Sequence, residues 1–180
     1  MASTTTMSGA AFDQLPLEEG RHLELLEGEV ITVATAIPEH QMIVLLLGAS
    51  LLNHFRRDAR GGVLPDSEFA LGEDTRVCPD LAVLLGERWV SLDRKKTPIP
   101  VAPDIAIEVI SPSERATDSQ RKVWVYLGAG VQEVWQVWSD TLKVFVYQGA
   151  KSVTILEVGD RLSTPLLPNW DLPLREIFSA

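Results

Sequence analysis

The spacing of apolar and polar residues in the first third of the chain predicts a hairpin followed by a helix. Short alternating pieces lie on both sides of Gly28 in "RHLELLEGEVITV", which places that glycine in the turn of a hairpin. After Pro38, the stretch "EHQMIVLLLGASLLNHFRRDARGG" is rich in Leu and Met and ends in basic residues and two glycines. This second pattern predicts a helix of about five turns.

The rest of the chain alternates between strand and helix patterns. "GVLPDSEFALG" and "TRVCPDLAVLLG" predict two strands joined near Gly72, followed by a loop over residues 86–103, and "DIAIEVI" predicts another strand. "SPSERATDSQRKVWVYLGAG" predicts a turn and a helix, with Thr117 and Gln120 at the spacing of a capping box and residues 128–130 ending the helix. "VQEVWQVW", "LKVFVYQ" and "SVTILEV" predict three strands, and "LPLREIF" a terminal helical turn. This order predicts an α/β or α+β domain, with a mixed sheet flanked by helices.

Length and composition agree with one globular domain. The chain has 180 residues, of which 46% are hydrophobic and 23% charged. We expect a flexible arm over residues 1–12, where "MASTTTMSGAAF" is small and polar and does not read as a secretory signal, and a single domain over residues 13–180. The longest apolar run, Met42–Leu52, is well below the roughly 20 residues that cross a bilayer. With a single cysteine, Cys78, the chain cannot form an intrachain disulfide, and we expect a cytoplasmic protein without a membrane span.

The net charge restricts the choice of partners. A formal charge of -9 repels nucleic-acid phosphates unless basic groups cluster or bound cations offset the carboxylates. The charge therefore counts against a simple nucleic-acid binding module, but it allows an enzyme that holds divalent metal ions.

An acid in the middle of an apolar strand is the first candidate for chemistry. In "DIAIEVI", strand alternation places Glu108 on the same face as Ala106 and Ile110. In a central strand, a carboxylate at that position costs several kcal/mol unless it is paired, protonated or bound to a metal. Asp80 likewise opens the apolar run of "VCPDLAVLL".

Structural explanations exist for each acid taken alone. An Asp after Pro, as at Asp80 and Asp104, is common at a strand entry, and Glu108 would be solvated if its strand lay at a sheet edge. Asp118 near a helix start suits the helix dipole, and with Lys122 it has the spacing of an ordinary (i, i+4) pair.

The ordered set of motifs resembles a known family. Pro79-Asp80, then 27 intervening residues, then an acid within an apolar strand and a lysine on the next helix resemble the PD-(D/E)xK nuclease superfamily. More specifically, the chain is similar to the Uma-type family of restriction-endonuclease-like proteins. The similar stretches are "LELLEGEV", "PEHQMIVLLL", "RVCPDLAVL", "APDIAIEVISPS", "DSQRKVWVYLGAGVQEVWQV" and "LLPNWDLPLREIF".

This resemblance implies a restriction-endonuclease-like fold and a metal-dependent endonuclease that hydrolyses DNA phosphodiester bonds. Asp80, Glu108 and the backbone carbonyl of Val109 would hold Mg²⁺ or Mn²⁺, which activates water and neutralises charge on the phosphate. Since many nucleases of the superfamily dimerise to cut both strands, the resemblance is compatible with a homodimer.

One position departs from the superfamily pattern. The lysine expected two residues after the Glu is Ile110 here, and the Uma-type pattern carries the basic group on the next helix, at Lys122. On a helix, Asp118, Lys122 and Tyr126 fall within roughly 80° of arc, so Lys122 can lean toward Glu108.

Two further residues match family positions near the site. Glu29 and His40 are expected to assist metal binding or water orientation, although a glutamate after a hairpin glycine is usually solvated and a histidine in a first helical turn is usually structural. A rival to Asp80 exists in Pro103-Asp104, but Asp104 and Glu108 would lie about 13 Å apart along one strand, too far for one metal ion.

Two alternative functions compete with the nuclease. A catalytically silent member of the fold, acting as a binding or assembly module, agrees with the net acidity and the missing strand lysine, but not with the joint presence of Asp80, Glu108 and Lys122. A glycosidase with two carboxylates explains neither Lys122 nor the motif order. Basic residues that could contact phosphate are few, and they are Arg56, Arg57, Arg60 and residues 94–96.

Overall fold

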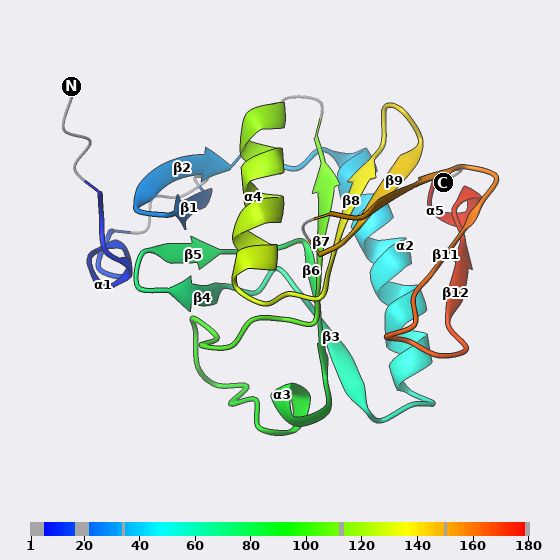
Figure 1. The fold of residues 1–180 in the computed structure, drawn as a ribbon, viewed down its shortest axis with the longest axis horizontal. Helices are drawn as coiled ribbons and strands as arrows, with labels where there is room; N and C mark the ends of the chain where they lie inside the picture. Colours follow the sequence, from blue (N-terminus) through cyan, green and yellow to red (C-terminus); the bar gives the residue numbers. More distant parts are fainter. Residues whose placement is uncertain (1–5, 17–21, 34, 112–113, 150, 179–180) are drawn as a thin grey trace.

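A six-stranded mixed sheet forms the centre of the molecule (Figure 1). The computed structural model describes residues 6–16, 22–33, 35–111, 114–149 and 151–178. Across the sheet the strand order is β10-β9-β8-β7-β6-β3, in which β7 pairs parallel with β8 and the other neighbours pair antiparallel. The strands are β3 (Gly61–Pro65), β6 (Leu81–Leu85), β7 (Ile105–Ile110), β8 (Glu133–Trp138), β9 (Lys143–Gln148) and β10 (Val153–Glu157). The predicted class, a mixed sheet flanked by helices, is confirmed.

Two long helices cover opposite faces of this sheet, α2 (Pro38–Phe55) and α4 (Ala116–Gly128). In α2, apolar residues spaced by four, from Ile43 to Phe55, pack against Ile105, Ile107 and Val109 of β7. On the other face, Val123 and Tyr126 of α4 lie in a core that includes Ala106. Since β7 alternates as predicted and lies inside the sheet, Glu108 points toward α4 from a central strand.

A smaller sheet packs beside α4, with the order β2-β1-β5-β4. Its strands are β1 (His22–Leu26), β2 (Glu29–Val33), β4 (Phe69–Gly72) and β5 (Thr75–Val77). The hairpin of β1 and β2 turns at Glu27 and Gly28, both with positive φ (50° and 83°), which suits the tight turns that match strand twist. The predicted hairpin with Gly28 in its turn is confirmed.

The N-terminal segment differs from the expected arm. Gly9–Phe12 form the short helix α1, and Phe12 is buried. Arg76 of β5, itself buried, binds both carboxylate oxygens of Asp13 at 2.8 and 2.9 Å and so ties this segment to the small sheet. Residues 9–12, within the expected arm, therefore form a short helix tied to the small sheet, while residues 1–5 lie outside the described part of the chain.

The segment from Gly61 to Gly86 holds four strands rather than the two that the pattern predicts. The chain leaves the large sheet after Pro65, where Asp66 has a positive φ of 42°, and it passes through β4 and β5 of the small sheet before it returns as β6. Gly72 does end β4, at the turn into β5. Because β4 and β5 are only four and three residues long, alternation could not separate them from their neighbours.

Two smaller predictions are also wrong. The expected loop after β6 begins with a helix, α3 (Gly86–Val90). Helix α4 begins at Ala116, and its N-cap Arg115 makes no side-chain capping bond, so Thr117 and Gln120 do not form the capping box. Thr117 is the second residue of the helix, so it cannot be the N-cap; its own N–H is one of the free donors that an N-cap side chain would bind.

The C-terminal segment, comprising β11 (Arg161–Ser163), β12 (Asp171–Pro173) and α5 (Arg175–Phe178), packs on the α2 face of the large sheet. Thr164 Oγ1, one residue after β11, donates to the buried Glu133 of β8 at 2.8 Å and so attaches this segment to the sheet. Glu133 also accepts from Trp135 Nε1 and Gln148 Nε2 within the sheet, both at 2.9 Å. The three late strands and the terminal helical turn are confirmed. None of the helices in the described residues is long and apolar enough to cross a membrane.

Candidate active site

The register of two adjacent strands brings Asp80 and Glu108 together. In the antiparallel pair of β6 and β7, Leu81 lies opposite Ile107, so the next position places Asp80 across from Glu108. Asp80 Oδ2 accepts a hydrogen bond from the backbone N–H of Val109 at 2.7 Å, which fixes the carboxylate against the end of β7. The two acids that the sequence singled out are therefore neighbours.

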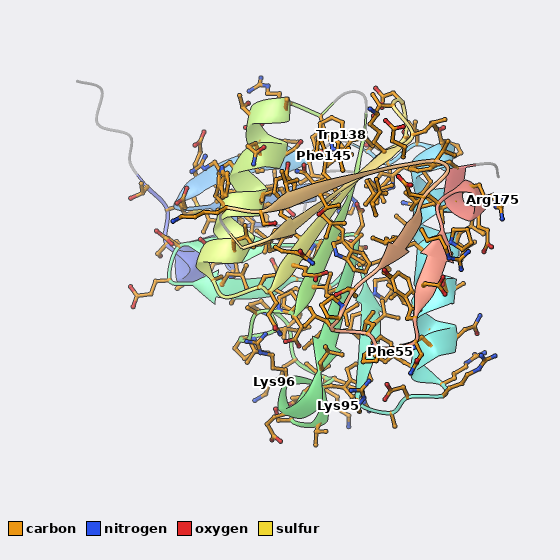
Figure 2. All side chains as sticks on the ribbon, turned by 45° about the vertical axis from the view of Figure 1, so that its right-hand side comes forward. Phe55, Lys95, Lys96, Trp138, Phe145 and Arg175 are labelled. Carbon is orange, nitrogen blue, oxygen red and sulfur yellow. The ribbon has the colours of Figure 1, made fainter. Side chains whose placement is uncertain are left out.

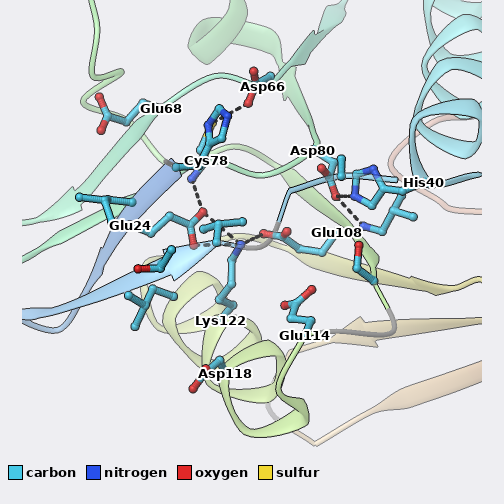
Figure 3. Close-up of a pocket in the computed structure, with 18 of the residues that line it drawn as sticks. Glu24, His40, Asp66, Glu68, Cys78, Asp80, Glu108, Glu114, Asp118 and Lys122 are labelled. Carbon is cyan, nitrogen blue, oxygen red and sulfur yellow. Dashed lines mark hydrogen bonds and ion pairs between the residues drawn. The ribbon is translucent and has the colours of Figure 1, made fainter. Parts of the chain in front are cut away.

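Lys122 reaches Glu108 from α4. Its Nζ lies 2.8 Å from Glu108 Oε1 (Figure 3). The hydroxyl of Tyr126 donates to the same oxygen at 2.6 Å. All three side chains are buried. The predicted approach of Lys122 to Glu108 is thus present in the structure, and Tyr126, expected only as an accessory residue on the same helix, contacts the same oxygen.

Burial and neighbouring charges shift the protonation of this group of residues. Burial raises the pKa of Glu108 to about 8, and the charge of Lys122 opposes this rise. For Lys122, burial lowers the pKa, but the negative charges of Glu108 and Glu24 outweigh it and hold the pKa above its ordinary value. Burial likewise raises the pKa of Tyr126 well above its usual range, so its hydroxyl remains a donor.

The site contains a second buried carboxylate that the sequence analysis did not single out. Glu24 of β1 is 2% exposed, and both of its carboxylate oxygens lie 3.1 Å from Lys122 Nζ. Its Oε1 also accepts the backbone N–H of Cys78 at 2.8 Å. The signal was available in "HLELL", where an acid interrupts an apolar strand in the same way as Glu108 does.

His40, in the first turn of α2, contacts Asp80. The distance from His40 Nε2 to Asp80 Oδ2 is 3.2 Å. Burial lowers the pKa of His40, but the hydrogen bond and charge of Asp80, with the charge of Glu114 and the backbone of Val109, raise it above its ordinary value. A histidine that the sequence placed near the site therefore holds one oxygen of Asp80.

A pocket of about 770 Å³ opens onto these groups, and its lining is strongly acidic. Lys122 and Arg115 are the permanent cations among the described residues that line it. Its carboxylates are Glu24, Glu29, Asp66, Glu68, Asp80, Glu108, Glu114 and Asp118 (Figure 3). Such a lining attracts cations and repels a phosphate that arrives without one.

The other candidates take different positions. Glu29 lines the pocket but is exposed, and it pairs with Arg121 of α4 at 2.6 Å. Asp118 also lines the pocket. The rival Asp104 is occupied by structural contacts, since it accepts from Leu85 N–H (2.7 Å), Arg88 Nη1 (3.0 Å) and Gln132 Nε2 (2.7 Å).

The arginines considered as phosphate contacts lie away from the pocket. Arg56, Arg57 and Arg60 follow the C-terminal end of α2, whereas His40 lies in its first turn. A helix of 18 residues is about 27 Å long. None of the three is among the described residues that line the pocket.

The basic loop after α3 is also remote. Figure 2 shows Lys95 and Lys96 at the opposite end of the molecule from Trp138. Trp138 pairs with Ile110, two residues beyond Glu108, and so marks the end of the sheet where the site lies. A nucleic acid seated over the pocket would not reach this loop without extending along the molecule.

The mixed sheet, with two acids at adjacent strand ends and a lysine from the covering helix, defines a protein of the restriction-endonuclease-like class. The chain belongs to the Uma2 family, described as "Putative restriction endonuclease", which matches residues 10–175. The fold is similar to that of "a putative nuclease belonging to DUF820" from Anabaena variabilis, with a TM-score of 0.84 and 22% sequence identity over 96% of this chain and 98% of the other. At that identity the likeness shows the fold alone. No curated protein matches the chain.

Proposed function

We propose that the protein is a metal-dependent endonuclease that hydrolyses DNA phosphodiester bonds. The observation that carries the proposal is the contact of 2.8 Å between Lys122 Nζ and Glu108 Oε1 in a pocket shared with Asp80. An acid pair at a strand end can hold a metal ion, and an adjacent ammonium can orient water or stabilise charge, so together they suit phosphodiester hydrolysis with a metal ion.

The donor atoms fit a hard divalent cation with few protein ligands. Within the described ranges, no group of three His, Cys, Asp or Glu side chains could hold a metal ion by itself. However, the hydrogen bonds and ion pairs described for the two acids fall on Asp80 Oδ2 and Glu108 Oε1, which leaves Asp80 Oδ1 and Glu108 Oε2 for a ligand. Mg²⁺ and Mn²⁺ suit this arrangement because they accept one or two carboxylates and complete their shells with water and phosphate oxygens. The backbone carbonyl of Val109 is the third protein donor in the proposal.

Each side chain then has a defined task. The bound metal supplies an activated water molecule and neutralises charge on the phosphate. Lys122, as an ammonium, orients that water or stabilises the charge that develops on the phosphate, in place of the missing strand lysine. Tyr126 and His40 fix one oxygen of Glu108 and of Asp80, and Glu29 and Asp118 are accessory acids of the pocket wall.

The setting of the reaction is part of the proposal. With eight carboxylates in the pocket, DNA approaches as a complex with cations rather than through a basic surface. We place the protein in the cytoplasm and expect a homodimer when both strands of a duplex are cut.

Mn²⁺ titration by calorimetry and nicking of supercoiled plasmid test the proposal together. Wild type is expected to bind Mn²⁺ and nick DNA, and Asp80→Asn and Glu108→Gln are expected to lose both while remaining folded by circular dichroism. Glu68→Gln is the matched control, because it removes a pocket carboxylate outside the proposed metal site. Lys122→Met should lower the nicking rate by about a hundredfold or more. If wild type binds no Mn²⁺ at millimolar concentration, the silent binding or assembly module replaces the nuclease.

A further inference from the structure

Lys122 lies between carboxylates that come from two different sheets. Glu108 approaches it from β7 of the large sheet at 2.8 Å, and Glu24 approaches it from β1 of the small sheet at 3.1 Å. Lys122 is 4% exposed, so its ammonium depends chiefly on these two carboxylates for stabilisation. The proposed metal site therefore shares Glu108 with a buried cation.

A divalent cation at Glu108 creates an electrostatic problem. The incoming charge repels the ammonium of Lys122 and competes for the carboxylate that neutralises it. A buried ammonium left without a partner is strongly destabilising, so Lys122 needs a second carboxylate that the metal does not take. Glu24 is the one that touches its Nζ.

The surroundings hold Glu24 in a fixed place relative to Lys122. The backbone N–H of Cys78 holds Glu24 Oε1 at 2.8 Å. Arg121, one residue before Lys122, donates to the backbone oxygen of Leu26 at 2.8 Å and pairs with Glu29 at 2.6 Å. These contacts attach the β1–β2 hairpin to α4 beside the point where the carboxylate of Glu24 meets the ammonium of Lys122.

We propose that Glu24 is a positioning residue, which keeps the ammonium of Lys122 beside the reacting phosphate when a divalent cation occupies Glu108. The proposal rests on the nuclease function and adds a partner for its lysine. Glu24 contacts neither the proposed metal nor the substrate, and it acts through Lys122 alone.

A double-mutant cycle on Mn²⁺ affinity tests this role by calorimetry. In the wild-type background, Glu24→Gln is expected to weaken Mn²⁺ binding about tenfold or more, because Glu108 is then the one carboxylate, among the described residues, that still contacts Lys122. In the Lys122→Met background the same change should alter the affinity by less than about threefold, because no ammonium remains to be held. Glu68→Gln, which removes a pocket acid outside the Lys122 contacts, should also stay within about threefold.

Plasmid nicking at saturating Mn²⁺ gives a second readout. Glu24→Gln should lower kcat by about tenfold with KM for DNA unchanged, since the ammonium of Lys122 then loses the contact that keeps it in its working position. Glu24→Asp, which retains the charge but withdraws it by one methylene, should fall between wild type and Glu24→Gln. This variant also serves if Glu24→Gln does not fold.

The outcomes separate this proposal from the nuclease function. A wild type that binds no Mn²⁺ overturns both. If wild type binds Mn²⁺ and nicks DNA, but Glu24→Gln weakens binding equally in both backgrounds, Glu24 contributes only its charge and the positioning role is wrong. A wild-type kcat in Glu24→Gln at saturating Mn²⁺ contradicts the role as well.

Discussion

Glu108 is a single residue whose burial destabilises the fold but places a carboxylate in the candidate active site. It lies in a six-residue strand whose side chains are all buried, where an unpaired carboxylate would cost several kcal/mol. Lys122 supplies the counter-charge and Tyr126 a short hydrogen bond, and both act on the same oxygen, Oε1. Both contacts thus stabilise the buried carboxylate at Oε1, and the other oxygen, Oε2, is left for the pocket.

The contribution of Tyr126 to this arrangement can be measured on the metal-free protein. Tyr126→Phe retains the packing of the ring but removes the donor to Glu108 Oε1, and we expect the free energy of unfolding to fall by about 1–3 kcal/mol. Urea denaturation followed by circular dichroism provides the measurement. Tyr147→Phe is the control, because Tyr147 donates to the neutral Gln136 at 3.2 Å and should cost only about 0.5–1.5 kcal/mol. Equal losses in the two variants would contradict a special role for the bond to Glu108.

At the scale of elements, close approach of β3 to β6 depends on glycine. A Cβ at Gly61 would lie 2.5 Å from the backbone oxygen of Leu84 and 3.0 Å from the ring of Phe55. The backbone oxygen of Leu84 cannot move aside as the end of a flexible side chain can. With a Cβ at Gly61, β3 would therefore have to shift relative to β6. By contrast, a Cβ at Gly128, the last residue of α4, would meet nothing within 4 Å.

These two glycines give opposite predictions for the same substitution. Gly61→Ala should lower the free energy of unfolding by about 1–3 kcal/mol through overpacking. Gly128→Ala should raise it by about 0.4–1 kcal/mol, since alanine restricts the unfolded chain and favours the helix. Thermal and urea denaturation of both variants would decide, and a stabilised Gly61→Ala would show that β3 can move away from β6 without loss.

Element predictions succeeded where the pattern was long and failed where short pieces belong to another sheet. The 18 residues of α2 carry four apolar positions at helical spacing, and β7 to β10 each carry five or six strand residues. Short strands such as β4 leave too few positions to establish a period, and their assignment to the small sheet depends on partners far away in the sequence.

For the whole molecule, the distribution of charge matters more than its sum. The net charge of -9 includes eight carboxylates gathered around one pocket. Mutual repulsion among them disfavours the compact state, and a bound cation relieves it. The protein should therefore gain stability from divalent metal ions at the site.

Thermal unfolding with and without Mn²⁺ tests this coupling. At a Mn²⁺ concentration one hundred times the Kd, binding adds about 2.7 kcal/mol to the free energy of unfolding. For a chain of 180 residues this corresponds to a rise in Tm of roughly 5–10 °C, which EDTA should reverse. Asp80→Asn should show little of the rise. An equal rise in that variant would place the stabilising ion elsewhere.

Residue patterns along the chain were enough to predict the mixed sheet, the two long helices and the candidates Asp80, Glu108 and Lys122. Local periodicity fixes helices and strands, and an acid within an apolar run stands out against its neighbours. The fold was needed to show that Glu24 belongs to the site, which contacts occupy Asp104, and that the basic residues lie away from the pocket. Those facts depend on strand register and on which sheet a short strand joins, and both are set by contacts between residues distant in the chain.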